Sequence, residues 1–480
     1  MDAITDLMGG FAVVFSPETL IWVFVGVMLG TVIGVLPGLG PASTIAILLP
    51  ITYSLPAEAA IIMLAGIYYG SMYGGTITSV LLRLPGEAAS VVTTFDGYQM
   101  ARAGRAGPAL GISAIGSFIG GTVAVIGLTF VAPLLASVAV GLGPPDYVAL
   151  AVLGLVLVSL LGTGSLLKAL IPAGQGLWLA SIGQDPVTGA ARFAFGSADL
   201  IGGLHLVPMV MGLFGIGEIL YNLGHRRRGD LVTKKVEHVL PRREDLRRSR
   251  GPIARGSVTG FLIGLLPGGG GVVSSLLSYT TEKRISKHPD QFGKGAIEGV
   301  AGPETANNAS STSSFIPLLT LGLPPNPVLA LIFGALLLQG ITPGPTMIET
   351  HPEVFWGVIA SMYVGNVILL ALNLPLVGIF VQLLRVKQEI LAPLTILVTV
   401  VGVYSVNNRV FDVGVAVLFG VIGYLMRKSG YAAAPLVLAF VLGSVLEPSL
   451  RQSLILSEGG LAIFLQRPVA VVLPNGLALG

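Results

Sequence analysis

The sequence predicts an all-α polytopic membrane protein built from two related halves. Hydrophobic residues make up 53% of the 480 positions and charged residues only 11%, which is too little polar surface for a soluble protein of this length. The segments 30–40 and 260–270 are also near copies of each other. From these observations we expect about 11–12 passes, including broken or re-entrant helices, with the two halves forming an inverted repeat.

Apolar runs approaching or exceeding the length needed to cross a bilayer, about 20 residues each, recur along the chain. They are 20–36, 59–82, 110–135, 148–161, 200–223, 328–341, 354–384, 391–406, 410–426 and 432–446. The start of the chain carries Asp2 and Asp6 instead of basic residues, so we expect no cleavable signal peptide. Cysteine is absent, which excludes disulfides and thiolate chemistry.

A basic segment, 225–256, divides the chain into an N-terminal membrane half (1–224) and a C-terminal membrane half (257–480). Between His225 and Arg255, eleven Lys and Arg residues face four Asp and Glu residues. Such a run can bind nucleic acid or anionic lipid, but in a membrane protein it is typical of a cytoplasmic loop. The acidic N-terminus indicates the periplasmic side. The first half should then cross an odd number of times, which inverts the second half.

The two near copies, GTVIGVLPGLG and GFLIGLLPGGG, each place a Leu-Pro-Gly break in apolar sequence, with Pro37 and Pro267 230 positions apart. Proline removes a backbone donor and glycine loosens the helix, so peptide groups lose their partners at membrane depth. Such groups persist only where protein or a polar cavity surrounds them. One broken segment per half is the sequence pattern that points to a transporter binding site between the halves.

Small polar residues follow each break and are the candidate substrate-binding residues. In the first half they are Gly38, Gly40, Ser43, Thr44, Gly75, Thr76, Thr78 and Ser79, and in the second half Gly268, Gly269, Gly270, Asn307, Asn308, Ser310 and Ser311. Amides and hydroxyls can solvate a carboxylate without a fixed counter-charge, so this chemistry suits an anionic organic ligand. Small residues also let membrane helices pack closely, which is the competing interpretation of any single Ser or Thr. The dense run 307–314 favours a functional role.

The energy source is expected to be an ion gradient. No phosphate-binding GxxxxGK[ST] loop occurs in the sequence, so we expect no ATP hydrolysis by this chain and no cofactor other than a coupling ion. Oxygens of Asn307, Ser310 and Thr312 could coordinate Na⁺, whereas Glu304 could carry a proton. The sequence leaves the choice between Na⁺ and H⁺ open.

Two other functions compete with a carrier. A passive channel for small anions could also be lined by small polar residues, although it would not need paired broken segments. An intramembrane hydrolase would need a nucleophile and a base, for which Ser113 and His205 are the candidates, but a serine in such a glycine-rich chain is weak support. We therefore expect a protein that is not an enzyme. Arg83, next to Leu84-Pro85-Gly86, could pair with a substrate carboxylate or reach the membrane interface.

Two longer blocks carry a family resemblance. YGGTITSVLLRLPGEAASVVTTFDGYQMARAGRAGPALGISAIGSFIGG (73–121) and GPETANNASSTSSFIPLLTLGLPPNPVLALIFGALLLQGITPGP (302–345) resemble the large membrane subunit of the tripartite tricarboxylate transporters. With the two Leu-Pro-Gly segments, the resemblance covers about two thirds of residues 30–345. Within it, the loop 96–102 matches a family signature but has Gln99 where proline is common.

The resemblance implies a bacterial inner-membrane protein that works with a small membrane subunit and a periplasmic solute-binding protein. It also implies uptake of carboxylates, citrate among them, driven by an ion gradient. The ligand-facing positions implied are those around 38–44, 74–79, 268–271 and 307–314. Which carboxylate is carried, and the oligomeric state, are left open.

Overall fold

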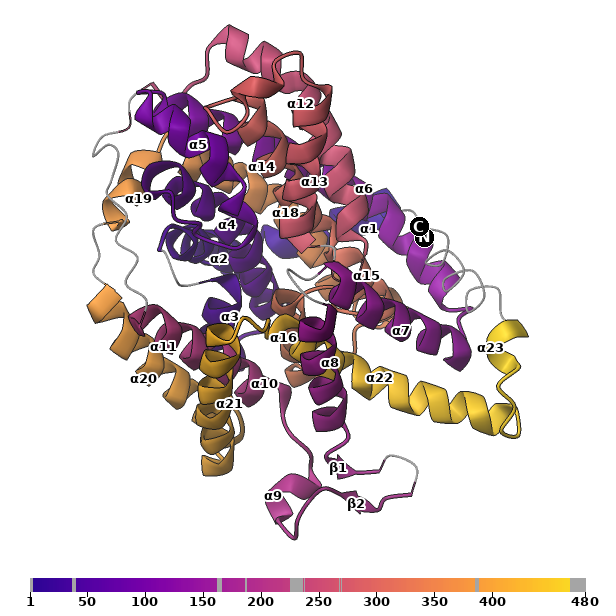
Figure 1. The fold of residues 1–480 in the computed structure, drawn as a ribbon. Coiled ribbons are helices and arrows are strands. Elements are labelled where there is room, and N and C mark those ends of the chain that lie inside the picture. The colour runs from indigo at the N-terminus through magenta and orange to yellow at the C-terminus, as the bar shows by residue number, and fades with distance from the viewer. Residues whose placement is uncertain are drawn as a thin grey trace.

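The computed structural model describes residues 3–36, 40–161, 166–185, 188–224, 236, 238–266, 268, 270–384 and 388–466. These residues form a helical bundle with one small β-hairpin (Figure 1). The first half contains α1 (Ala3–Val14), α2 (Pro17–Val35), α3 (Pro41–Thr52), α4 (Ala57–Leu82), η1 (Ala89–Val91), α5 (Thr93–Arg102), α6 (Ala106–Ala139), α7 (Pro144–Leu161), α8 (Leu166–Ala180), β1 (Gly183–Gln184), β2 (Ala191–Arg192), α9 (Ala198–Ile201), α10 (Leu206–Val210), the π-helix η2 (Met211–Ile216) and α11 (Gly217–Gly224).

The second half contains α12 (Arg243–Gly264), α13 (Gly270–Ile285), η3 (Pro289–Gln291), α14 (Glu298–Ser313), α15 (Phe315–Leu321), α16 (Pro327–Leu338), α17 (Met347–Thr350), α18 (Pro352–Asn373), α19 (Val377–Leu383), α20 (Gln388–Asn407), α21 (Val410–Lys428), α22 (Ala434–Leu456) and α23 (Ile463–Gln466). Strands β1 and β2 pair antiparallel, with Gly183 opposite Arg192.

Six helices in the described residues are long and apolar enough to cross a membrane. They are α2, α4, α6, α18, α21 and α22, and six shorter apolar helices accompany them. The prediction of an all-α polytopic membrane protein is therefore confirmed, while the number of passes stays a prediction. Helix α4 lies at the centre, because its entire apolar window is buried by other helices.

Helices α2 and α4 pack backbone against backbone through a stripe of glycines. A Cβ built on Gly26 would lie 2.5 Å from the Met63 carbonyl oxygen, and one on Gly30 would lie 2.6 Å from that of Ile67. Gly34 abuts the Ser71 carbonyl even more closely. Only glycine permits such an approach, and the contacts advance in the same direction along both helices. Helix α4 therefore runs parallel to α2 after the chain has returned through α3.

Helices α12 and α14 repeat this arrangement in the second half. A Cβ on Gly256 would lie 2.6 Å from the Gly302 carbonyl oxygen, and Gly260 and Gly264 abut the carbonyls of Ala306 and Ser310. Each stripe glycine follows its first-half counterpart by 230 positions, and each partner follows its counterpart by 239 positions, as Ser310 follows Ser71. The two helix pairs are thus built on one plan. The inversion of one half relative to the other stays a prediction.

Helix α6 packs against both helix pairs. Thr76 of α4 accepts a hydrogen bond from Ser113 of α6. Tyr73, one turn earlier on α4, donates to Asn366 of α18, and Asn366 donates to the carbonyl of Phe118 of α6. The contacts therefore run in opposite order along α4 and α6. Along α14 they run in the same order, since Gly116 faces Ala301 and Gly120 faces Thr305.

The basic segment 225–256 is helical over its second part, because α12 begins at Arg243. Residues 225–235 and 237 lie outside the described residues. Helix α12 starts with a capping arrangement in which the backbone N–H of Arg242 donates to the carboxylate of Asp245 over 3.2 Å. Arg248 and Arg255 form ion pairs with Glu298 and Glu282. The predicted loop is thus only partly a loop, since these acidic partners stabilise a helix within it.

Candidate functional site

The candidate site lies where α4, α6 and α14 meet the connection 83–92 between α4 and α5. The run 307–313 stays helical within α14, and every residue of it is buried. Helix α4 is buried from Ala59 to Leu82, so the polar residues near its C-terminal end face protein. The two polar clusters predicted from the sequence therefore meet in one interior region.

Glu304 is buried at the contact between the two halves, with 1% of its surface exposed. The Thr76 hydroxyl donates to its Oε2 over 2.6 Å, and the Thr93 hydroxyl donates to its Oε1. Ser113 extends this set by donating to Thr76 over 3.3 Å. Three hydroxyl groups from the first half thus surround a carboxylate from the second.

Glu87 is the second buried carboxylate and is 8% exposed. Its Oε2 accepts the backbone N–H of Ala89 over 2.7 Å, and its Oε1 accepts the Asn307 side-chain amide over 3.2 Å. A Cβ on Gly75 would lie 2.8 Å from the Glu87 Cγ, so α4 needs glycine at this position. The missing side chain of Gly75 makes room for the protein's own Glu87, and a role of Gly75 in substrate binding stays a prediction.

Two polar atoms on one face of α14 have no hydrogen-bond partner among the residues that the structure describes. They are Oδ1 of Asn307 and Oγ of Ser310, and both are buried. The neighbouring Asn308 differs, because its amide donates to the Ser117 hydroxyl over 2.7 Å and to the Glu304 carbonyl over 3.1 Å. Ser311 donates to the Asn308 carbonyl over 3.0 Å. A buried polar atom without a partner is costly, so these two acceptors are the places where a ligand gains most.

The second break lies against this face. A Cβ on Gly271, in the first turn of α13, would collide with Asn307 Oδ1 and would lie 2.9 Å from Cβ of Ala89. Gly268 has a positive φ of 78°, and its N–H donates to the Pro325 carbonyl over 2.8 Å. Gly270, at the start of α13, also has a positive φ, whereas Pro267 and Gly269 lie outside the described residues.

The end of α2, just before the first break, lies on the other side of the connection 83–92. The Thr78 hydroxyl donates to the Val35 carbonyl over 2.6 Å, and Gly86 packs against Gly34 and Gly75. The Ser79 hydroxyl is within 3.0 Å of both the Gly75 carbonyl and the Ser90 hydroxyl. Gly86 and Ala89 thus lie beside the first and the second break respectively, with Glu87 between them.

Ser43 and Thr44, which directly follow the first break, make their hydrogen bonds outside this cluster. The Ser43 hydroxyl donates to the Phe214 carbonyl of the π-helix over 2.7 Å, and Thr44 donates to the carbonyl of Gly40 over 3.1 Å. Gly40 has nothing near the position of a Cβ, and Pro37 and Gly38 lie outside the described residues. The structure does not bring Ser43 and Thr44 to the cluster around Asn307, because α3 packs towards α16 and α20.

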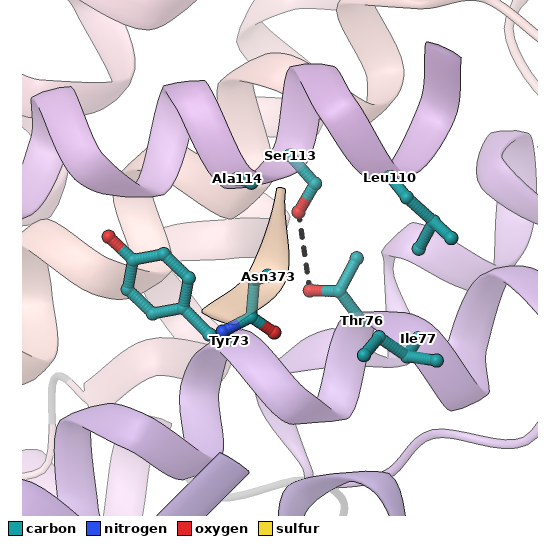
Figure 2. Close-up of a pocket in the computed structure, with 7 residues that line it drawn as sticks. All are labelled: Tyr73, Thr76, Ile77, Leu110, Ser113, Ala114 and Asn373. Atoms are coloured by element: carbon teal, nitrogen blue, oxygen red, sulfur yellow. Dashed lines mark hydrogen bonds between the residues drawn. The ribbon is translucent and has the colours of Figure 1, made fainter. Parts of the chain in front are cut away.

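A small pocket opens beside the Thr76–Ser113 hydrogen bond. Figure 2 shows it between α4 and α6, closed on one side by Asn373 of α18. Its lining residues are Tyr73, Thr76, Ile77, Leu110, Ser113, Ala114 and Asn373. Oδ1 of Asn373 is buried without a partner. The pocket therefore places a further free acceptor next to the Glu304 hydroxyl cluster.

Of the residues considered for other roles, Ser113 belongs to this cluster, whereas no hydrogen bond, ion pair or ring contact joins His205 or Arg83 to it within the described residues. Among the described residues no hydrogen bond joins Ser113 to His205, whose Nε2 is 3.1 Å from a guanidinium nitrogen of Arg409. Arg83 is exposed, ends α4 with a φ of 56°, and lies over the Tyr98 ring at 5.7 Å from its centroid. The hydrolase interpretation thus has no geometric support, and Arg83 faces outward.

The signature loop 96–102 forms α5 and fastens the start of α14. Asp96 is fully buried, and its Oδ1 accepts the backbone N–H groups of Gly293, Gly295 and Ala296 over 2.7 to 2.8 Å. Its Oδ2 accepts the Tyr279 hydroxyl over 2.8 Å. One carboxylate of the first half therefore fixes the connection that leads into the helix carrying Glu304 and Asn307.

Sequence reasoning missed Glu87, Thr93 and Ser117 as members of the site. A signal for Glu87 was present, because a carboxylate directly after Leu84-Pro85-Gly86 follows a third proline-glycine break in apolar sequence. Thr93 and Ser117 gave no such signal, since each is one of many hydroxyl residues in the chain. Their roles follow only from the tertiary contacts with α14.

Comparison with known proteins identifies the family. A family model described as tripartite tricarboxylate transporter TctA family matches residues 20–438. An uncharacterized 52.8 kDa protein in the TAR-I ttuC′ 3′ region of Agrobacterium vitis is 50% identical over 479 residues, covering 100% of this chain and 95% of that protein. An uncharacterized protein in the TAR-II ttuC′ 3′ region of the same organism is 52% identical over 214 residues, covering 45% of this chain and 88% of that protein. No solved structure matches the chain. The resemblance seen in the motifs is confirmed: this chain belongs to the tripartite tricarboxylate transporter TctA family, a family of transporters and not of enzymes.

Proposed function

We propose that this chain, a membrane component of a tripartite tricarboxylate transporter, carries an organic tricarboxylate or dicarboxylate into the cell by ion-gradient-driven secondary transport. It receives the substrate from a periplasmic solute-binding protein and works with a small membrane subunit in the bacterial inner membrane. The N-terminus lies on the periplasmic side and the basic segment 225–256 in the cytoplasm.

The observation that carries the proposal is the position of the connection 86–89 between the two breaks. Gly86 packs against Gly34 and Gly75 near the first break, and Ala89 lies next to Gly271 at the second. Oδ1 of Asn307, which has no hydrogen-bond partner among the described residues, lies against Gly271 in the same region. Polar groups left open at a junction of broken segments are typical of transporter substrate sites.

Alternating access by inverted halves is supported by the directions of the helices. Contacts run in opposite order along α4 and α6 but in the same order along α6 and α14. The two glycine-striped pairs, α2/α4 and α12/α14, then run in opposite senses on one plan. Rocking of such pairs around a shared site exposes it to each side in turn.

Substrate binding relies on donors that carry no fixed positive charge. The N-terminus of α13 and the Ser310 hydroxyl supply partial charges of the kind that a carboxylate needs when it leaves water. Because no permanent cation holds the anion, release on the other side remains fast.

The test is transport by the complete three-component system. Membrane vesicles containing this chain and its small subunit, supplied with the solute-binding protein, are assayed with a panel of labelled dicarboxylates and tricarboxylates under an imposed Na⁺ or proton gradient. We expect accumulation of at least one member and faster labelled uptake when the far side is preloaded. Uptake without acceleration by preloading would indicate a channel, and no uptake of any carboxylate would contradict the proposal.

Substitution of Asn307 or Asn308 tests whether this amide pair belongs to the site. Asn307→Ala is expected to reduce uptake by at least tenfold while leaving the folded protein intact, because one of its polar atoms has no protein partner to lose. Asn308→Ala is expected to reduce uptake as well, but together with thermal stability, since it removes the bonds to Ser117 and to Glu304. Normal uptake in both variants would remove the amide pair from the site.

A further inference from the structure

Two buried carboxylates in the site have no positively charged partner. In the part of the chain that the structure describes, the hydrogen bonds of Glu87 and Glu304 come from hydroxyls, a backbone N–H and the Asn307 amide, and none from Lys, Arg or His. Both side chains are more than nine-tenths buried. An ionised carboxylate in such surroundings is strongly destabilised unless a cation neutralises it.

The two carboxylates belong to one unit. Glu304 and Asn307 are three residues apart on α14, which places them on one face of the helix. Asn307 donates to Glu87, so the helix that carries Glu304 also contacts the second acidic group. Neighbouring residues of α4 touch both carboxylates, since Gly75 lies against the Glu87 side chain and the Thr76 hydroxyl donates to Glu304. One cation bound among these groups stabilises both of them.

Asn307 Oδ1 is the independent sign of a ligand. It is a buried acceptor with no partner, on the same amide group that contacts Glu87, and it faces the start of α13, where Gly271 leaves room. A carboxylate oxygen, an amide oxygen and threonine hydroxyls form a set of hard oxygen ligands. Such a set accepts a small monovalent cation.

We propose that Glu87, Glu304 and Asn307 form the coupling-ion site, which takes up one monovalent cation, a proton or Na⁺, before the substrate binds. The proposal rests on the proposed function, because it explains how an anionic substrate can enter a site that holds two acidic residues. Neutralisation of the pair removes the repulsion that would otherwise exclude a carboxylate. Binding of cation and substrate is then cooperative.

Cation binding can be measured without any carboxylate. The purified full-length protein is heated in buffers of constant ionic strength in which NaCl replaces choline chloride, and in a series of increasing pH. Binding of Na⁺ raises the thermal midpoint, because a ligand that binds only the folded state stabilises it. If the cation is a proton, the midpoint is insensitive to Na⁺ and falls as pH rises, because the folded state then binds more protons than the unfolded one.

Three variants test whether the thermal response to Na⁺ or pH comes from Glu87 and Glu304. Glu87→Gln and Glu304→Gln keep the side-chain shape but need no counter-charge, so we expect either to abolish the Na⁺ response or flatten the pH response. Both should also be at least as stable as the wild type in alkaline buffer without Na⁺. Glu58→Gln, at the start of α4 and outside the buried pair, is the matched control and should respond as the wild type does. Wild-type protein that responds to neither cation, or glutamine variants that respond fully, would overturn the proposal.

If a glutamine variant is not recovered in folded form, the wild type still decides the question. Carbodiimide labelling followed by mass spectrometry should modify Glu87 or Glu304, with labelling reduced by Na⁺ or by rising pH. Labelling that is confined to other carboxylates, or unchanged by both conditions, would contradict the site. A wild type that binds the cation but transports no carboxylate would instead refute the proposed function alone.

Discussion

The helix pairs α2/α4 and α12/α14 share one backbone plan but carry different chemistry. Their glycine stripes contact equivalent carbonyls, so Tyr68 and Tyr69 of α4 correspond to Asn307 and Asn308 of α14. The tyrosine hydroxyls are bonded to Asn326 and to the Ser361 carbonyl, within the scaffold. The amides instead reach Glu87 and Ser117. Architecture is thus shared, while the groups available to a ligand concentrate in the second pair.

One serine occurs at the same place in both pairs and makes the difference plain. The Ser71 hydroxyl donates to the Tyr68 carbonyl over 2.7 Å, whereas Ser310 Oγ has no partner. Both residues are fully buried. A buried serine in a helix commonly bonds a carbonyl of the preceding turn, as Ser71 does. The Ser310 hydroxyl makes no such bond, and it is thus available to a ligand.

The helices that follow the two breaks, α3 and α13, also differ in their contacts. Ser275 of α13 donates to the Pro303 carbonyl over 3.2 Å and keeps α13 beside α14. In the first half, Ser43 donates to the Phe214 carbonyl of the π-helix, and α3 packs against α20 and the π-helix as well as against α4. The connection from α3 to α4 is short, whereas the one from α13 to α14 spans residues 286–297 and is held by Asp96. The second half is thus kept in place by the first.

The largest expected effect comes from disrupting the glycine contacts on which both helix pairs are built. Gly34→Val and Gly264→Val each force a side chain into the backbone of the partner helix, so we expect destabilisation of about 3 kcal/mol or more and little folded protein. Gly40→Ala, at a position with open space, is the control. Recovery of monodisperse protein after extraction measures the effect. Equal recovery of Gly34→Val and wild type would show that the stripe is not essential.

Loss of the connection between the halves should rank next. Asp96→Ala removes four hydrogen bonds to a buried carboxylate, for which we expect a cost of about 3 kcal/mol. Hydrogen exchange should increase most around residues 293–297, at the start of α14, and far less in the α2/α4 pair. Uniform exchange across both pairs would argue against a local role.

The serine pair sharpens the comparison directly. Ser71→Ala should cost about 1 kcal/mol of stability and leave uptake per folded molecule unchanged, because it loses one internal hydrogen bond. Ser310→Ala should do the reverse, with unchanged or higher stability and reduced uptake. Thermal unfolding and transport of the same preparations separate the two effects. Equal behaviour of both variants would remove the functional asymmetry between the halves.

Arg83→Ala should have the smallest effect. The guanidinium is exposed over Tyr98 and does not reach Glu87 or Asn307, so we expect a stability change below about 0.5 kcal/mol and near-normal uptake. Measured substrate affinity is the sensitive readout. A large loss of affinity would mean that Arg83 moves into the site during transport.

The sequence predicted the features that depend on local composition. The membrane class follows from hydropathy, and the paired Leu-Pro-Gly breaks and the polar run at 307–314 could be found by inspection. The contacts that make the site could not, because Glu87 and Asn307 are 220 positions apart and Thr93 and Glu304 are 211 apart. Ser43 and Ser274 lie six and seven residues after the prolines of their breaks, yet only tertiary packing decides that Ser43 binds the π-helix while α13 packs along α14.

The glycine stripes also determine which parts of the molecule can move. Where backbone rests on backbone, no long side chains exist that could change rotamer and let one helix slide along the other. We therefore expect each pair to move as a single rigid body during the proposed transport cycle, with any change of shape occurring between the pairs and not within them.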